Sequence, residues 1–444
     1  MAPLDQKMDT ADDIGLLRFS TAGSVDDGKS SLIGRLLYDS KAVSTDRIAA
    51  LERIARRKGE DVIDLSLLMD GLTVEREQGI TIDVAYSYFA TAQRKFIIAD
   101  TPGHEQYTRN MVTGASTADA AVILVDAARG LSLQTRRHLY LSHLLGVPHL
   151  VVAVNKMDLV GFDKGAYDIV VASIEAFADA IGAKRTYIVP ISAKHGDNVV
   201  NASTNMPWYE GQPLLALLEA LPPAIVMHQA PFRFPVQLVR RVPVHGGEQI
   251  RQYLGRVESG HIKAGDEIAV MPAGRVTRVR AVSDFHGPLE RGESGRSIAI
   301  EVQDELDIAR GDVLTPPLLP PRVDDEFTAT ICWFSDDGFN GQGRYLVKCG
   351  TRTVAGRVAE IIYRLDVATL ATEPNPETLR CNDIARVRIA LAESLAFDAY
   401  DANRATGAFI LIDADTNATV AAGMIALRDG EATAAGGSGF DVGL

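Results

Sequence analysis

The sequence predicts an α/β domain followed by two β-barrel domains. Through the first half of the chain, short apolar runs alternate with amphipathic stretches, which is typical of a parallel sheet with crossover helices. In the second half, short β-rich runs are separated by turns that contain glycine. Proline clusters at 222–223 and 316–321 interrupt the pattern, because proline ends helices and stiffens linkers. We therefore expect domains at 1–223, 224–316 and 317–430, with a flexible tail at 431–444.

The first domain is expected to hold five strands and at least three helices. Each predicted helix is long enough to cross over a parallel sheet. The predicted strands are 17–22, 95–99, 120–126, 150–155 and 186–190, and the predicted helices are 31–38, 133–145 and 167–181. In the barrels, the predicted strands include 234–238, 267–271, 275–282 and 297–302.

Composition restricts the classes of protein to which the chain can belong. At 444 residues the chain exceeds a single core, and 46% hydrophobic with 23% charged residues is ordinary for a soluble protein. The N-terminal residues lack a secretory signal layout, and no apolar run is long enough to span a membrane. We expect a cytoplasmic protein with no membrane partner. A net charge of −13 makes nucleic acid an unfavourable partner.

Three cysteines are too few and too scattered for a disulfide framework or a metal site. Cys332, Cys349 and Cys381 are odd in number and lie far apart. We expect buried or inert thiols, as free cysteine is commonly found in protein cores.

A phosphate-binding loop follows the first predicted strand and opens the first predicted helix. Residues 23–30 read GSVDDGKS and fit the pattern G-x-x-x-x-G-K-[ST]. Backbone N–H groups of such a loop face phosphates, Lys29 would neutralise the β- and γ-phosphates, and Ser30 would bind Mg²⁺. The predicted phosphate-binding residues here are Gly23, Ser24, Val25, Asp26, Asp27, Gly28, Lys29, Ser30 and Ser31.

Two further segments are expected to complete the phosphate and magnesium site. Asp100 ends a predicted strand, where open α/β sheets bind ligands, and can hold Mg²⁺ through water. Gly103 would bring its N–H to the γ-phosphate. Thr81, in the segment Gly-Ile-Thr-Ile at 79–82, would add a magnesium ligand. Taken alone, the first of these segments can be a simple turn and the second a strand entry.

A guanine-reading segment, Asn-Lys-Met-Asp at 155–158, ends another predicted strand. The Asp158 carboxylate can accept hydrogen bonds from the ring N–H and the exocyclic amine of guanine, whereas adenine offers a mismatched edge. Ser-Ala-Lys at 192–194 can complete the base pocket through backbone N–H groups. The predicted guanine-binding residues are Asn155, Lys156, Asp158, Ser192, Ala193 and Lys194. Together the segments predict a GTP-hydrolysing site.

These segments, in this order, resemble the translation-factor class of P-loop GTPases, of which elongation factor Tu is the familiar member. The resemblance implies an α/β P-loop GTPase domain followed by two β-barrel domains. It also makes His104 the catalytic residue that positions the attacking water, with Val25 and Ile80 as apolar neighbours that limit its access. Without the resemblance, His104 can equally be a solvated loop histidine.

Several stretches resemble, more narrowly, the GTPase (large) subunits of heterodimeric sulfate adenylyltransferases. These stretches include GSVDDGKSSLIGRLLYDSK at 23–41 and NMPWYEGQPLLALLE at 205–219. The resemblance implies a partner small subunit that makes adenosine 5′-phosphosulfate and pyrophosphate from ATP and sulfate, while this chain hydrolyses GTP with Mg²⁺. Some members carry a fused adenosine-phosphosulfate kinase domain with its own phosphate loop. Only one such pattern occurs here, so we expect a separate kinase.

Two other functions remain open from the sequence. The same fold suits a carrier of aminoacyl-tRNA that is loaded with GTP. It also suits an interaction protein in which GTP hydrolysis times release from a partner.

Overall fold

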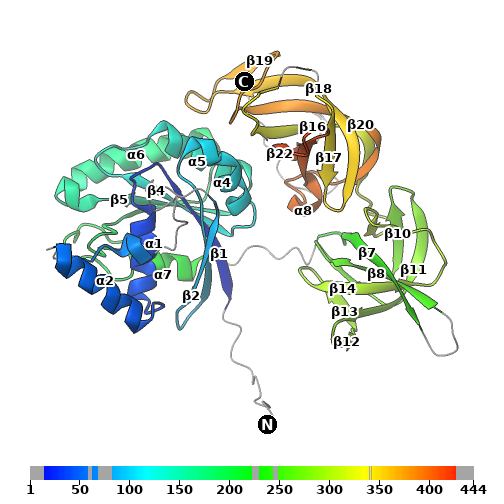
Figure 1. Ribbon diagram of the computed structural model, residues 1–444, viewed down its shortest axis with the longest axis horizontal. Coiled ribbons are helices and arrows are strands. Elements are labelled where there is room, and N and C mark those ends of the chain that lie inside the picture. Colours follow the sequence, from blue (N-terminus) through cyan, green and yellow to red (C-terminus); the bar gives the residue numbers. More distant parts are fainter. Residues whose placement is uncertain are drawn as a thin grey trace, which may run out of the picture. The chain divides into compact units, whose positions relative to one another are not determined.

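The chain forms two compact units, Met1–Ala224 and Ile225–Leu444 (Figure 1). The computed structural model describes residues 15–58, 63–68, 83–222, 230–243, 249–339, 341 and 343–426. The predicted site residues Ile80 and Thr81 and the predicted tail at 431–444 lie outside the described residues. The predicted domain boundaries stay predictions.

The first unit contains a six-stranded sheet in the order β2-β3-β1-β4-β5-β6. The strands are β1 (Leu16–Gly23), β2 (Ala85–Ala90), β3 (Lys95–Asp100), β4 (Ala120–Asp126), β5 (His149–Asn155) and β6 (Thr186–Pro190). All neighbours are parallel except β2, which runs antiparallel to β3. Every residue of β4 and β5 is buried, as expected of central strands covered on both faces. All five predicted strands of this domain are confirmed, and β2 is an addition.

Helices cover both faces of this sheet. Figure 1 shows α1 and α7 on one face and α4 and α5 on the other. Leu32, Ile33 and Leu36 of α1 share one core with Leu17 and Phe19 of β1. The helices are α1 (Lys29–Asp39), α2 (Thr45–Lys58), α4 (Thr108–Ala115), α5 (Leu133–Leu144), α6 (Lys164–Ala180) and α7 (Leu214–Ala220), with 3-10 turns η1 (Leu65–Leu68), η2 (Glu105–Tyr107) and η3 (Met157–Val160).

Six strands of the second unit close a first β-barrel. Its ladder runs β10-β15-β7-β8-β14-β11, and β10 also pairs with β11, which closes the ring. Phe234, Tyr253, Ile300 and Leu314 lie in its core. The strands are β7 (Phe234–Pro243), β8 (Gln249–Arg256), β10 (Glu267–Met271), β11 (Arg275–Asp284), β14 (Ser297–Val302) and β15 (Val313–Thr315), beside the short β9 (His261–Lys263), β12 (Gly287–Pro288) and β13 (Arg291–Glu293).

Six later strands close a second barrel in the same way. Its ladder runs β17-β21-β22-β16-β20-β18, and β17 also pairs with β18. Phe327, Trp333, Phe397 and Phe409 fill its core. The strands are β16 (Arg322–Trp333), β17 (Tyr345–Cys349), β18 (Arg352–Leu365), β20 (Ile384–Phe397), β21 (Ala408–Asp413) and β22 (Thr419–Ala426), with the short β19 (Thr372–Pro374) and the one-turn α8 (Arg404–Gly407). The predicted fold of one α/β domain and two barrels is confirmed.

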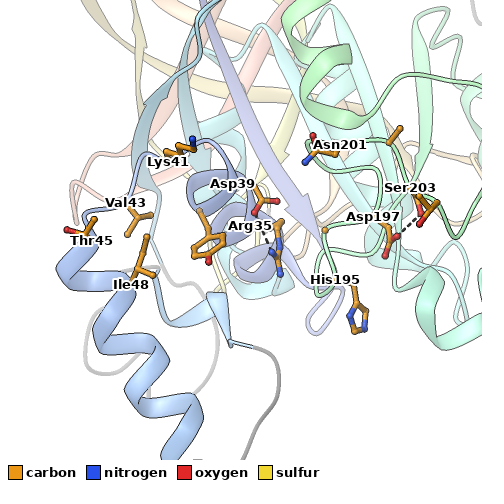
Figure 2. Close-up of a pocket in the computed structure, with 14 residues that line it drawn as sticks. Arg35, Asp39, Lys41, Val43, Thr45, Ile48, His195, Asp197, Asn201 and Ser203 are labelled. Carbon is orange, nitrogen blue, oxygen red and sulfur yellow. Dashed lines mark hydrogen bonds and ion pairs between the residues drawn. The ribbon is translucent and has the colours of Figure 1, made fainter.

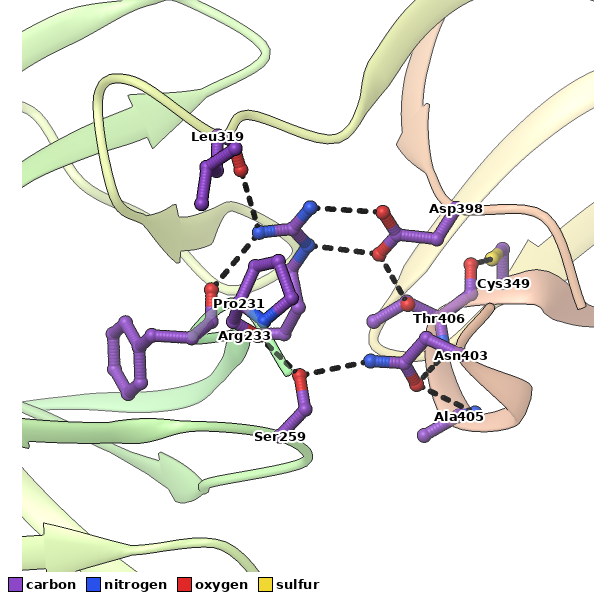
Figure 3. A network of polar contacts seen from close by, with 10 residues as sticks. Pro231, Arg233, Ser259, Leu319, Cys349, Asp398, Asn403, Ala405 and Thr406 are labelled. Carbon is purple, nitrogen blue, oxygen red and sulfur yellow. Dashed lines mark hydrogen bonds and ion pairs between the residues drawn. The ribbon is translucent and has the colours of Figure 1, made fainter. Parts of the chain in front are cut away.

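A buried polar network joins the two barrels (Figure 3). The Arg233 guanidinium donates to both carboxylate oxygens of Asp398, over 2.8 and 2.9 Å. Its remaining terminal nitrogen donates to the Leu319 carbonyl over 2.9 Å. Beside this pair, the Asn403 side-chain amide donates to the Ser259 hydroxyl, which donates to a backbone carbonyl. The charges and amides in this contact are therefore matched by protein groups.

The three cysteines are free thiols. Cys332 and Cys349 are buried, as predicted, and burial raises the pKa of the Cys349 thiol to about 12. Cys381 is partly exposed, because it lies in the turn before β20 and outside the barrel core. In the part of the chain that the structure describes, no helix is both long and apolar enough to cross a membrane.

Candidate functional site

The carboxyl ends of the parallel strands bring the predicted site segments to one edge of the sheet. Gly23 ends β1, Asp100 ends β3 and Asn155 ends β5. The register aligns Thr21 with Asp100 and aligns Asp126, at the end of β4, with Asn155. Segments that are far apart in sequence therefore meet where open parallel sheets bind their ligands.

The phosphate-loop backbone requires glycine at position 28. Gly28 adopts the left-handed conformation, with φ of 94°, immediately before α1 begins at Lys29. A Cβ atom there would lie 2.5 Å from the Asn155 side-chain nitrogen. That nitrogen donates to the Asp27 carbonyl over 2.8 Å. The segment predicted to read guanine thus contacts the phosphate loop at the N-terminus of α1, where backbone N–H groups favour an anion.

Lys29 lies beside the predicted magnesium ligand Asp100. The Lys29 ammonium donates to the Thr101 carbonyl over 2.6 Å and lies 4.0 Å from an Asp100 oxygen. The same oxygen accepts a hydrogen bond from Thr21 over 2.9 Å. Ser30 follows in the first turn of α1. A hydroxyl and a carboxylate are oxygen donors that suit Mg²⁺, so these residues fit this ion.

The loop after β3 passes close to the phosphate loop. A Cβ atom on Gly103 would collide with the Gly23 carbonyl, so this approach requires glycine. His104 is partly buried, and its Nδ1 accepts a hydrogen bond from the Gln106 N–H over 3.4 Å. Val25, its predicted apolar neighbour, is 38% exposed.

Asp27 is a buried carboxylate inside the phosphate loop. Burial raises its pKa to about 6, although the Ser24 N–H that it accepts over 2.8 Å works in the opposite direction. Lys156 forms a 2.9 Å ion pair with Asp126 close by. Sequence reasoning missed Asp126, yet the rule that selected Asp100, a carboxylate ending a parallel strand, also selects Asp126.

The predicted guanine-binding residues contact one another at the ends of β5 and β6. Ser192 donates its hydroxyl to Asp158 over 2.7 Å. The Ala193 N–H donates to the Asn155 side-chain oxygen over 2.9 Å. His195 Nε2 lies 3.8 Å from the second Asp158 oxygen. The structure therefore places Ser192 and His195 at the Asp158 carboxylate and Ala193 at Asn155.

The sequence did not predict a contact between the phosphate loop and the start of α5. The Ser24 hydroxyl lies 2.7 Å from the hydroxyl of Ser132, which caps α5 by accepting from the Thr135 N–H. These partners lie more than one hundred positions apart in sequence. A serine directly before a predicted helix indicates an N-cap, but no local pattern predicts that this serine contacts the phosphate loop.

Comparison with known families agrees with this arrangement. Residues 15–227 match the family model "Elongation factor Tu GTP binding domain", and residues 251–315 match "Elongation factor Tu domain 2". Residues 326–426 match "GTP-eEF1A C-terminal domain-like". The fold and the site thus define a P-loop GTPase of the elongation factor Tu type.

Relatives narrow this class. The chain is 47% identical to "Sulfate adenylyltransferase subunit 1" of Saccharophagus degradans over 92% of its own length and 86% of that protein. It is 49% identical to the protein of the same name in Psychromonas ingrahamii, over 92% and 87% of the two chains. It is 51% identical to "Bifunctional enzyme CysN/CysC" of Mycobacterium tuberculosis, over 93% of this chain and 67% of that one. The chain belongs to the sulfate adenylyltransferase subunit 1 family, and it is an enzyme with a GTPase domain.

Proposed function

We propose that this chain is the GTP-hydrolysing large subunit of a sulfate adenylyltransferase and works with a small adenylyltransferase subunit. GTP hydrolysis drives the small subunit to form adenosine 5′-phosphosulfate and pyrophosphate from ATP and sulfate, the first step of sulfate assimilation. The observation that carries this proposal is the close similarity to subunit 1 relatives across 92% of the chain. We place the complex in the cytoplasm.

The phosphates of GTP lie in the loop 23–31 in this proposal. Lys29 turns from the Thr101 carbonyl toward the β- and γ-phosphates, where an ammonium neutralises more charge. Ser30, Asp100 and Thr81 would hold Mg²⁺, which would offset the negative charge of the phosphates. The Gly103 N–H meets the γ-phosphate, so the loop after β3 responds to hydrolysis.

The base lies against the cluster around Asp158. Its carboxylate accepts from the ring N–H and the exocyclic amine of guanine, and the Ser192 hydroxyl keeps that carboxylate in place. Adenine presents no matching donors to this carboxylate, so with adenine the partly buried Asp158 would lose both hydrogen bonds that guanine offers. This selectivity makes GTP the substrate.

His104 positions the water that attacks the γ-phosphorus. The water forms a bond to phosphorus as the bond to the β-phosphate oxygen breaks, giving GDP and phosphate. Val25 and Ile80 restrict the access of His104 to that water. On the partner, a sulfate oxygen attacks the α-phosphorus of ATP and pyrophosphate leaves. The mixed anhydride is a high-energy product, and linked states in the two subunits let GTP hydrolysis pull its formation forward.

Reconstitution tests the proposed function. The chain is mixed with its small-subunit partner, ATP, sulfate, Mg²⁺ and GTP, and adenosine 5′-phosphosulfate is measured against time. We expect GTP to raise the yield and a non-hydrolysable GTP analogue to fail to do so. A yield that is the same with and without GTP would contradict the proposed coupling.

His104→Ala tests the catalytic assignment. We expect turnover of GTP to fall on the order of a hundredfold, because a positioned catalytic group contributes about that much. Affinity for GTP should stay unchanged, since the side chain orients water and does not hold the nucleotide. Single-turnover hydrolysis and equilibrium titration measure the two quantities. Unchanged turnover would remove the assignment.

A further inference from the structure

An arginine on α1 contacts the loop that closes the base site. Arg35 Nε donates to the Ala193 carbonyl over 3.2 Å, and one terminal nitrogen donates to the Lys194 carbonyl over 2.6 Å. The other terminal nitrogen lies 3.4 Å from Asp39, one turn further along the helix. The Arg35 side chain is 14% exposed, so most of it is buried, and its hydrogen bond to the Lys194 carbonyl lies at the surface.

Arg35 lines a cleft of about 770 Å³ between the C-terminal end of α1 and the loop after residue 194 (Figure 2). Asp39 lies beside Arg35 in this view, and His195 and Asp197 come from the facing loop. Arg35 thus spans from the helix that starts at the phosphate loop to the segment that completes the base pocket.

The planar guanidinium suits this contact better than any other side chain. Its N–H groups are arranged in a rigid fork, which can reach two successive carbonyls and a carboxylate at once. Lysine would offer a single ammonium on a flexible stem and could not reproduce the fork. The residue type therefore matters beyond its charge.

The hydrogen bond from Arg35 to a carbonyl also fixes the direction of the N–H group in the same peptide unit. The Ala193 carbonyl and the Lys194 N–H belong to one planar trans peptide, so they point in opposite directions. The Ala193 N–H is already fixed by Asn155. With Arg35 on the carbonyl, the direction of the Lys194 N–H is set as well.

We propose that Arg35 is a positioning residue for base recognition, which aims the Lys194 N–H at the oxygen on C6 of guanine. This inference rests on the proposed function, because it requires a guanine nucleotide in the site. Arg35 contacts the loop and not the base. It therefore affects how strongly the loop prefers a base with an oxygen on C6 over one without it. Asp39 keeps the fork in place from behind.

The test compares GDP with 6-thio-GDP on the full chain carrying Arg35→Ala or Arg35→Lys. The thio analogue keeps both donors for Asp158 but replaces the C6 oxygen with sulfur, a weak acceptor. Equilibrium titration should show a loss on the order of tenfold in GDP affinity for Arg35→Ala, equivalent to about one good hydrogen bond. The affinity for the thio analogue should fall much less, so the ratio of the two affinities becomes smaller in Arg35→Ala than in the parent chain. Arg35→Lys should lie between this variant and the parent chain.

Arg56→Ala is the matched control, because Arg56 is an exposed arginine on α2. It should leave both affinities unchanged. Thermal unfolding of each variant checks that the fold is kept. Equal losses for GDP and the thio analogue would show general damage and would overturn the proposal, as would no loss for either. A parent chain that binds no guanine nucleotide would instead overturn the proposed function itself.

Discussion

Two largely buried clusters of charge differ in the groups that face their charged side chains. Between the barrels, Arg233 and Asp398 pair through two short hydrogen bonds, and Thr406 donates to the same carboxylate. At the phosphate loop, the Lys29 ammonium donates to a neutral backbone carbonyl over 2.6 Å and lies 4.0 Å from the Asp100 carboxylate, while burial raises the pKa of Asp27 to about 6.

This difference separates a structural cluster from a binding cluster. Buried charges are costly unless they are paired and hydrogen-bonded. Between the barrels the compensation is internal, so the network contributes to the stability of the second unit. At the phosphate loop, burial disfavours the Asp27 carboxylate, and in the proposed function Lys29 meets the phosphates of GTP. Substitutions should therefore affect unfolding in the first cluster and nucleotide binding in the second.

The largest effect is expected for Arg233→Ala. It leaves the Asp398 carboxylate, which is 14% exposed, without its guanidinium, and breaking a largely buried pair in this way costs about 3–5 kcal/mol. Urea unfolding followed by Trp333 fluorescence, in a Trp208→Phe background, reports on the second unit. Arg240→Ala, an exposed position on β7, is the control. If Arg233→Ala lost no more free energy of unfolding than Arg240→Ala, the structural role of the cluster between the barrels would be contradicted.

Lys29→Ala should affect binding instead. Hydrogen bonds to charged groups contribute about 1.5–3 kcal/mol each, so loss of the contacts to two phosphates should weaken GTP binding at least about a hundredfold. The change in the free energy of unfolding should be smaller than that of Arg233→Ala. Titration with a fluorescent GTP analogue measures the affinity, with Lys164→Ala on α6 as the control. Equal GTP affinity in the two variants would remove Lys29 from the site.

Asp27→Asn should stabilise the nucleotide-free chain at neutral pH. The folded-state pKa of about 6 exceeds the ordinary value of 3.8, so stability is fully present below pH 4 and falls as pH rises through 6. The shift corresponds to about 3 kcal/mol at neutral pH. Asparagine can still accept from the Ser24 N–H but carries no charge.

Unfolding of parent and Asp27→Asn chains at pH 4 and pH 8 measures this effect. We expect a large difference in the free energy of unfolding at pH 8 and a small one at pH 4. Asp46→Asn, at the exposed start of α2, is the control, and its free energy of unfolding should match that of the parent chain at both pH values. A variant with the parent's pH dependence would show that Asp27 is not the titrating group.

Ser259→Ala gives the smallest expected effect. Its hydroxyl donates to the Pro231 carbonyl and accepts from Asn403, and removing one neutral hydrogen-bonding group typically costs about 1–2 kcal/mol. The same Trp333 measurement applies, with Ser294→Ala as a partly exposed control. A cost as large as that of Arg233→Ala would mean that the network acts as one unit.

The sequence predicted strands well where burial was complete and poorly where it was partial. The predicted ranges 120–126 and 186–190 coincide with β4 and β6, because continuous apolar runs and flanking turns mark them. The edge strand β2 was missed, since Tyr86 and Tyr88 face outward and only Phe89 is buried. The polar strand β8 was missed for a similar reason.

The site was predictable only where a local motif marks it. The structure brings together the motif residues of the phosphate loop, the Asp100 loop and the base segment. Arg35 and Ser132 were not found, because their partners lie over one hundred positions away and no local pattern encodes such contacts. Their placement follows from the sheet order, which becomes visible only in the folded chain.

The ladder of the second barrel has a consequence for its synthesis. β16 is the first strand made, yet its neighbours in the ladder are β20 and β22. β16 ends at Trp333 and β20 begins at Ile384. Because the ribosome adds roughly 5–20 residues per second, several seconds pass between the synthesis of β16 and that of β20, its first native neighbour. During that interval Phe327 and Ile331, which the finished barrel buries, depend on chaperones or transient contacts to stay out of water.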